Sequence, residues 1–157
     1  MSLLKTAEKT EQKIHDTLAL SNNFDLPKAV IYSVKTKPSN EIEIVQRHDN
    51  GDVYDLLSDE YTLSVAKNSE YIAVLTCGWA SPIDPDKDEN DDDQVAPSQH
   101  PQRRRVRLMV LASRNGVASV LRFSDSPNET VTDDGNARGS LADAVLKLFA
   151  QAEAGNN

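Results

Sequence analysis

Alternating hydrophobic and polar positions run through the middle of the chain and predict strands. In residues 41–47 (EIEIVQR) isoleucines alternate with glutamates, the pattern of a strand with one solvated face. The segment 29–35 (AVIYSVK) precedes it across a turn-like KPSN. Residues 71–81 (YIAVLTCGWAS) are apolar at consecutive positions, as in a central strand covered on both faces. We therefore expect a sheet with a buried centre.

A hairpin is the clearest single prediction. The apolar runs 106–113 and 117–123 flank Arg114-Asn115-Gly116, and Asn-Gly between two such runs favours a tight hairpin turn. Asp49-Asn50-Gly51 can also reverse the chain, so residues 53–57 (VYDLL) are either a returning strand or a short helix. Residues 61–66 (YTLSVA) are equally compatible with a strand or a helix.

Helical periodicity marks the two ends of the chain. In residues 3–20 the apolar face is thin, because Thr10 and Glu11 interrupt it, so this helix should be an outer helix or arm. A second helix should run from Ser140 to about Ala152, with Ser140 and Asp143 as a capping box. Its apolar stripe is Leu141, Val145, Leu148 and Ala152.

Taken together, these elements predict an α+β fold. We expect a mainly antiparallel sheet of about five strands, with the N-terminal and C-terminal helices packed on it. Residues 1–157 should form a single domain, since the length suits one core. Residues 1–25 would be the N-terminal helix or arm, and 82–102 an acidic, flexible loop inserted between core strands.

Composition narrows the class of protein. The net charge of −8 favours solubility and disfavours nucleic acid as the main partner. The N-terminus predicts no signal peptide, and no apolar run is long enough to span a membrane. Cys77 is the only cysteine, so no intrachain disulfide can form. We expect a cytoplasmic protein that has no membrane partner and needs no cofactor.

An acidic block occupies residues 84–93 (DPDKDENDDD). Asp84, Asp86 and Asp88 alternate like the first three ligands of a calcium loop. The sixth and twelfth positions are Glu89 and Val95 instead of glycine and glutamate, so the EF-hand pattern fails. A loose divalent-cation site remains open, but a solvated loop is the favoured interpretation because consecutive like charges repel.

Four arginines follow this loop, at positions 103, 104, 105 and 107. Arg105 and Arg107 share one face of the predicted strand, so that face is exposed or paired with carboxylates. Three interpretations remain: a site for an anionic ligand or partner at Arg103, Arg105 and Arg107, an internal clasp with the acidic block, or a charged strand edge that discourages edge pairing. Aromatic residues are not interleaved with the arginines, which argues further against nucleic-acid binding.

Other candidate residues give weaker signals. Trp79, the only tryptophan, ends an apolar strand and either seals the core or marks a ligand or dimer surface. His48 could form a catalytic pair with Asp49 or Asp52, although turn residues favour a turn, and His100 is the other candidate histidine. We expect Cys77 to be a small buried hydrophobe instead of a nucleophile.

The strings GWASP, APSQHPQRRRVRLMVLASRNGVASVLRF and GSLADAVLKLF carry a resemblance that covers residues 70–150. In this region the chain resembles small conserved hypothetical proteins of high-GC Gram-positive (actinobacterial) bacteria, a group with no assigned activity. The resemblance implies a bacterial, cytoplasmic origin. It also implies that the acidic insert varies in length among such proteins, which argues against an essential role for its carboxylates.

These observations favour a non-enzymatic module that binds a protein or small-molecule partner, with a homodimer left open. The alternative is a small hydrolase-type enzyme that uses a histidine–carboxylate pair. A third hypothesis is weak divalent-cation binding by the acidic loop.

Overall fold

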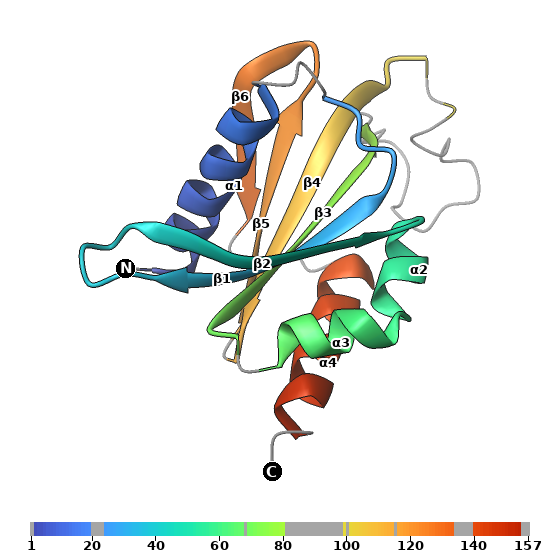
Figure 1. The fold of residues 1–157 in the computed structure, drawn as a ribbon. Helices are drawn as coiled ribbons and strands as arrows, with labels where there is room; N and C mark the ends of the chain where they lie inside the picture. The colour runs from blue at the N-terminus through green and yellow to red at the C-terminus, as the bar shows by residue number, and fades with distance from the viewer. Residues whose placement is uncertain are drawn as a thin grey trace.

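In the computed structural model, ten helices and strands are placed within the 157-residue chain (Figure 1). The structure describes residues 2–19, 24–67, 69–80, 99, 101–114, 116–133 and 140–154. The elements are α1 (Leu3–Ala19), β1 (Ala29–Thr36), β2 (Ile42–Asn50), α2 (Val53–Leu57), α3 (Glu60–Ala66), β3 (Tyr71–Ala80), β4 (Arg104–Ser113), β5 (Gly116–Phe123), β6 (Ser126–Asp133) and α4 (Ser140–Ala154).

The six strands form one open antiparallel sheet in the order β2-β1-β3-β4-β5-β6. The predicted hairpin is confirmed, because β4 pairs with β5 from Val106↔Phe123 to Ser113↔Gly116. The predicted α+β class is also confirmed, but the sheet has six strands where we expected about five. The additional strand is β6 (SPNETVTD), whose residues are mostly exposed, so it carries no apolar alternation that the sequence could reveal.

Aspartates decide the two ambiguous segments in favour of helices. The Asp52 carboxylate accepts hydrogen bonds from the N–H groups of Tyr54 and Asp55, and the Asp55 side chain accepts one from the Asp52 N–H. This reciprocal capping box begins α2, so the strand alternative for residues 53–57 is wrong. Asp59 caps α3 through the Tyr61 N–H. The predicted chain reversal does occur at Gly51, with φ of +27°.

Helices cover both faces of the sheet. The face under α1 contains a core that includes Ala7, Ile14, Tyr32, Leu75 and Met109. On the other face, α2, α3 and α4 lie together, as Figure 1 shows. Their core includes residues such as Ile31, Leu56, Val65, Val74 and Val145. The N-terminal helix therefore packs fully on the sheet, and the sheet is the middle of three layers.

The apolar stripe predicted for the C-terminal helix faces this second core. Val145, Leu148 and Ala152 are buried in α4, and Leu141 is half-buried. The helix begins at Ser140 as expected, while the predicted cap contact of the Ser140 side chain lies outside what the structure describes. Among the described helices, none has the length and apolar character needed to cross a membrane.

Candidate partner-binding site

Strand alternation brings charged residues to one end of the sheet on its α1 face. In the β3–β4 ladder Trp79 lies opposite Arg105, and Cys77 lies opposite Arg107. In the next ladder Arg107 lies opposite Arg122 of β5. Because successive residues of a strand point to opposite faces, Arg105 and Arg107 share the side on which α1 lies. The sequence predicted this shared face, although not what covers it.

The exposed part of this cluster is built around the tryptophan. The guanidinium carbon of Arg103 lies 4.9 Å from the Trp79 ring centroid, and that of Arg105 lies 5.1 Å from it. Trp79 is 39% exposed. Arg105 also donates from Nε to Asp25 Oδ1 at 2.8 Å. We call Trp79, Arg103 and Arg105 the Trp79 surface, and it brings together three of the four residues that the sequence suggested for binding.

The fourth predicted residue, Arg107, is buried next to this surface on the same face of the sheet. It is 2% exposed, and its guanidinium carbon lies 4.5 Å from the ring centroid of Phe24. Its Nη2 donates to Nδ1 of His15 on α1 at 2.5 Å. An imidazole nitrogen that accepts a hydrogen bond must be unprotonated. In agreement, burial and the nearby charges of Arg122 and Arg107 lower the pKa of His15.

A buried ion pair adjoins Arg107. Arg122 donates from Nε to Glu11 Oε2 at 2.8 Å and from Nη2 to Oε1 at 2.5 Å. The two side chains are 3% and 4% exposed. Arg122 also donates to Pro127 O and to Gln12 Oε1. The buried layer formed by Glu11, Arg107 and Arg122, which the half-buried His15 borders, thus contains two guanidinium groups and one carboxylate.

Cys77 behaves as a structural residue in this cluster. Its Sγ accepts a hydrogen bond from the Leu26 N–H at 3.3 Å and lies 3.7 Å from Phe24 O. Burial raises the pKa of the thiol, so the sulfur stays protonated and is a poor nucleophile. The half-buried side chain fastens residues 24–26 to β3, which places Phe24 over Arg107 and Asp25 beside Arg105.

Arg104 points to the opposite face of the sheet and serves a different purpose. It donates to both carboxylate oxygens of Asp125, at 3.1 Å and 2.7 Å, and lies 3.5 Å from Glu129. The Asp125 carboxylate raises the pKa of Arg104, and Arg104 lowers the pKa of Asp125. Of the four arginines that follow the acidic loop, Arg104 thus pairs with Asp125 and Glu129, and Arg105 pairs with Asp25.

His48 does meet a carboxylate, but the partner is Asp59. Their Nε2 and Oδ2 atoms lie 2.8 Å apart, and Asn50 Nδ2 donates to the same oxygen at 2.9 Å. These hydrogen bonds, with that from the Tyr61 N–H, lower the pKa of Asp59. A lowered pKa makes the Asp59 carboxylate a weaker proton acceptor than an ordinary aspartate. The predicted partners are used elsewhere, because Asp49 binds Arg47 and Asp52 caps α2.

Three hollows lie on the described surface. One of about 430 Å³ lies between α1 and β5 and includes Lys5, Lys9 and Arg122. Another, of about 280 Å³, lies beside the start of α4 and is mostly apolar. A third, of about 400 Å³, lies between α1 and the β1–β2 turn. Neither His48 nor Asp59 lines these three hollows, and the other oxygen of Asp59 caps α3 through the Tyr61 N–H.

Several predictions fall on residues outside those that the structure describes, among them the acidic loop within 82–102 and its clasp with the arginines. Asp84, Asp86 and Asp88, the suggested metal ligands, are among them, and so is His100. Within the part of the chain that the structure describes, His, Cys, Asp and Glu side chains do not gather in groups of three or more that could hold a metal ion. The cation-binding hypothesis therefore remains a prediction.

The sequence contained unused signals for the buried layer. Glu11 interrupts the apolar stripe of α1, and Arg122 follows Ala118 and Val120 on the inward face of β5. A charged residue on each of two apolar faces indicates a buried pair. The aromatic partners of the arginines were harder to find, because Phe24, Trp79 and Phe123 are distant in sequence.

Comparison with known proteins adds no identification: no protein-family model, curated protein or solved structure matches the chain.

Proposed function

We propose that this protein is a non-enzymatic binding module and that the Trp79 surface recognises an acidic segment of a partner protein. The observation that carries this proposal is the exposed tryptophan with guanidinium groups of Arg103 and Arg105 stacked on it. Tryptophan and arginine are the residue types that most often dominate binding energy at protein interfaces. Their convergence from β3 and the start of β4 is therefore the strongest interaction signal on the described surface.

The chemistry of the surface favours carboxylates. A guanidinium that stacks on an aromatic ring through its face directs its edge N–H groups away from the ring, in the geometry that suits planar, bidentate acceptors. Arg105 already holds one carboxylate, that of Asp25, whose side chain is 69% exposed. A carboxylate of a partner can make the same contact in exchange for Asp25.

The buried layer strengthens the attraction for anions. Arg107 and Arg122 lie next to the Trp79 surface on the same face of the sheet, and Glu11 supplies one negative charge for both. Charge in a low-dielectric interior is weakly screened, so the excess positive charge acts on the neighbouring Trp79 surface. The overall charge of −8 nevertheless opposes a long polyanion such as nucleic acid.

Binding can be tested with a glutamate-rich peptide, because Trp79 is the only tryptophan and its fluorescence reports on this surface. We expect the peptide to change the emission at low ionic strength and the effect to fade as salt is added. Arg105→Gln should weaken binding about tenfold, since it removes a charge-assisted hydrogen bond. Arg104→Gln is the matched control, because Arg104 lies on the opposite face and binds Asp125.

Two results would contradict the proposal. One is an equal loss of peptide affinity in both variants, which would place the binding elsewhere. The other is tighter binding of a single-stranded oligonucleotide than of the peptide at the same ionic strength. Circular dichroism of each variant establishes that the fold is retained.

A further inference from the structure

The outer strand β2, together with α2 and α3, forms a second surface of unusual composition. β2 is at one edge of the sheet, and both helices contact it. Three of the large hydrophobic residues that are exposed lie on these elements: Val45 at 56%, Tyr54 at 63% and Tyr61 at 52%. Exposed tyrosines beside an open strand edge are typical of protein interfaces. We call these three residues and the charges around them the β2 surface.

Acidic residues gather at one end of this surface. The end of β2 and the starts of α2 and α3 meet there, since His48 and Asn50 both contact Asp59. The basic residues at this end are Arg47 and Lys28. Lys28 lies here because the next residue, Ala29, pairs with Asn50. The acidic residues, which outnumber them, are Asp49, Asp52, Asp55, Asp59 and Glu60.

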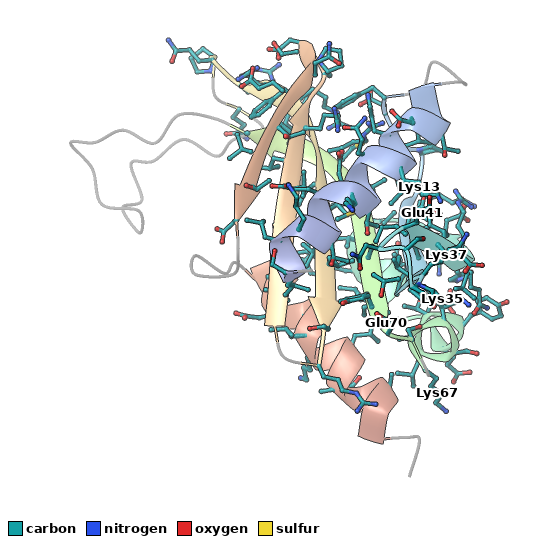
Figure 2. The ribbon with its side chains drawn as sticks, turned by 90° about the vertical axis from the view of Figure 1, so that its left-hand side faces the viewer. Lys13, Lys35, Lys37, Glu41, Lys67 and Glu70 are labelled. Carbon is teal, nitrogen blue, oxygen red and sulfur yellow. The ribbon has the colours of Figure 1, made fainter. Side chains whose placement is uncertain are left out.

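Basic residues gather at the other end, around the β1–β2 turn. Five lysines lie here against three glutamates, and Figure 2 shows most of them on one side of the molecule. Two of the glutamates already have partners, because Glu43 pairs with Lys35 and Glu70 accepts from Thr36. The lysines are Lys9, Lys13, Lys35, Lys37 and Lys67, and the glutamates are Glu41, Glu43 and Glu70.

Helix α3 has the same polarity. It begins with Glu60 at the acidic end, and Lys67 follows its last residue at the basic end. Glu70, just beyond the end of α3, accepts from Thr36, which pairs with Ile42 at the start of β2. Asp59, just before the start of α3, contacts His48 near the end of β2, so α3 and β2 run in opposite directions. One surface therefore carries an acidic end where both tyrosines lie, Val45 near the middle of β2, and a basic end.

A two-fold rotation about the middle of this surface places the acidic end of one copy on the basic end of another. We propose that the β2 surface is the interface of a symmetric homodimer, in which each copy supplies both halves of the charge complementarity. A closed two-fold dimer buries the same patch on both subunits, so that patch must be complementary to itself. A surface that is acidic at one end and basic at the other meets this requirement. A second copy is thus the partner that fits both ends at once.

Side chains, and not a continued sheet, make the contact in this proposal. The β1–β2 register shifts between Ser33 and Val34, and Val45 is the extra residue on β2. A bulge in an outer strand interrupts the ladder of backbone groups that edge-to-edge pairing requires. Lys13 also donates to Ile42 O at 2.7 Å, so one carbonyl at the start of β2 is already bound. Val45 would then lie near the centre of the contact, and the tyrosines at the acidic end of one copy would face the lysines at the basic end of the other.

Charge exchange tests the interface without relying on one variant. Native mass spectrometry at low ionic strength should show a dimer for the unaltered chain. Lys37→Glu with Lys67→Glu makes both ends acidic, and each change acts twice in a symmetric dimer, so we expect the dissociation constant to rise about a hundredfold. Glu60→Lys weakens self-association in the same way, and a mixture of the two variants should form the heterodimer.

The matched control is Lys5→Glu with Lys147→Glu, which changes the net charge equally at exposed lysines of α1 and α4. It should remain dimeric. A monomeric unaltered chain, or a Lys37→Glu/Lys67→Glu variant that dimerises like the control, would overturn the proposal. Peptide binding at the Trp79 surface is measured separately, so the binding proposal and the dimer proposal can be refuted independently.

Discussion

The buried pair between Glu11 and Arg122 gives the sharpest test of how the chain is held together. Glu11→Gln removes the negative charge while keeping nearly the same shape and one acceptor. Arg122 then keeps Pro127 O and Gln12 Oε1, but it loses its only buried carboxylate among the described residues. Arg107, in register beside it, would be a second buried cation without a counter-charge.

The expected loss follows from this burial. Breaking a buried ion pair from one side costs about 3–5 kcal/mol, because an uncompensated charge remains in the interior. The free energy of unfolding of a native domain is about 5–15 kcal/mol in total, so the variant should lose a large part of its stability. At about 2–4 °C for each kcal/mol, the melting temperature should fall by about 6–20 °C.

Urea denaturation followed by circular dichroism measures this loss. Glu8→Gln is the control, because Glu8 pairs with Lys5 at 3.8 Å on an exposed part of the same helix and should change stability by less than about 0.5 kcal/mol. The double variant Glu11→Leu/Arg122→Met should recover most of the loss, since replacing both charges by apolar groups is nearly neutral. If Glu11→Gln costs no more than Glu8→Gln, the reasoning about the buried layer is refuted.

Two further predictions concern single residues. Neutral His15 accepts from Arg107, and its pKa is lowered from 6.5 in the folded chain, so the unfolded chain binds the proton first and stability should fall as pH drops below 6.5. Thermal melts across this range should show a weaker pH dependence for His15→Gln, and an unchanged dependence would argue against the contact. Gly51→Ala should destabilise by about 1 kcal/mol or more, because φ is positive and a Cβ would collide with Asp55. Gly78→Ala, with open space around its Cα, should be nearly neutral in the same denaturation assay.

Local patterns were sufficient for much of the fold. The apolar run at 71–80 became the central strand β3, and β4 pairs with β5 as the predicted hairpin requires. Capping chemistry explains the two short helices, and Asp52-x-x-Asp55 could have indicated α2 in advance. β6 was missed because a polar outer strand is defined by its pairing with β5 and not by its own pattern.

The candidate site was only partly predictable. Strand alternation correctly grouped Arg105 with Arg107, but it could not tell that one stays at the surface and the other is buried against α1. That difference depends on where α1 and residues 24–26 cross the sheet, which is a tertiary property. For the same reason, the sequence indicated no aromatic partners for the arginines, although Trp79 and Phe24 lie against them in space.

The most direct test of the central claim is an NMR titration of the unaltered protein with a glutamate-rich peptide. The largest chemical-shift changes should occur at the indole N–H of Trp79 and at the side-chain N–H groups of Arg103 and Arg105. Changes confined to the lysines of the β2 surface, with Trp79 unmoved, would contradict the claim.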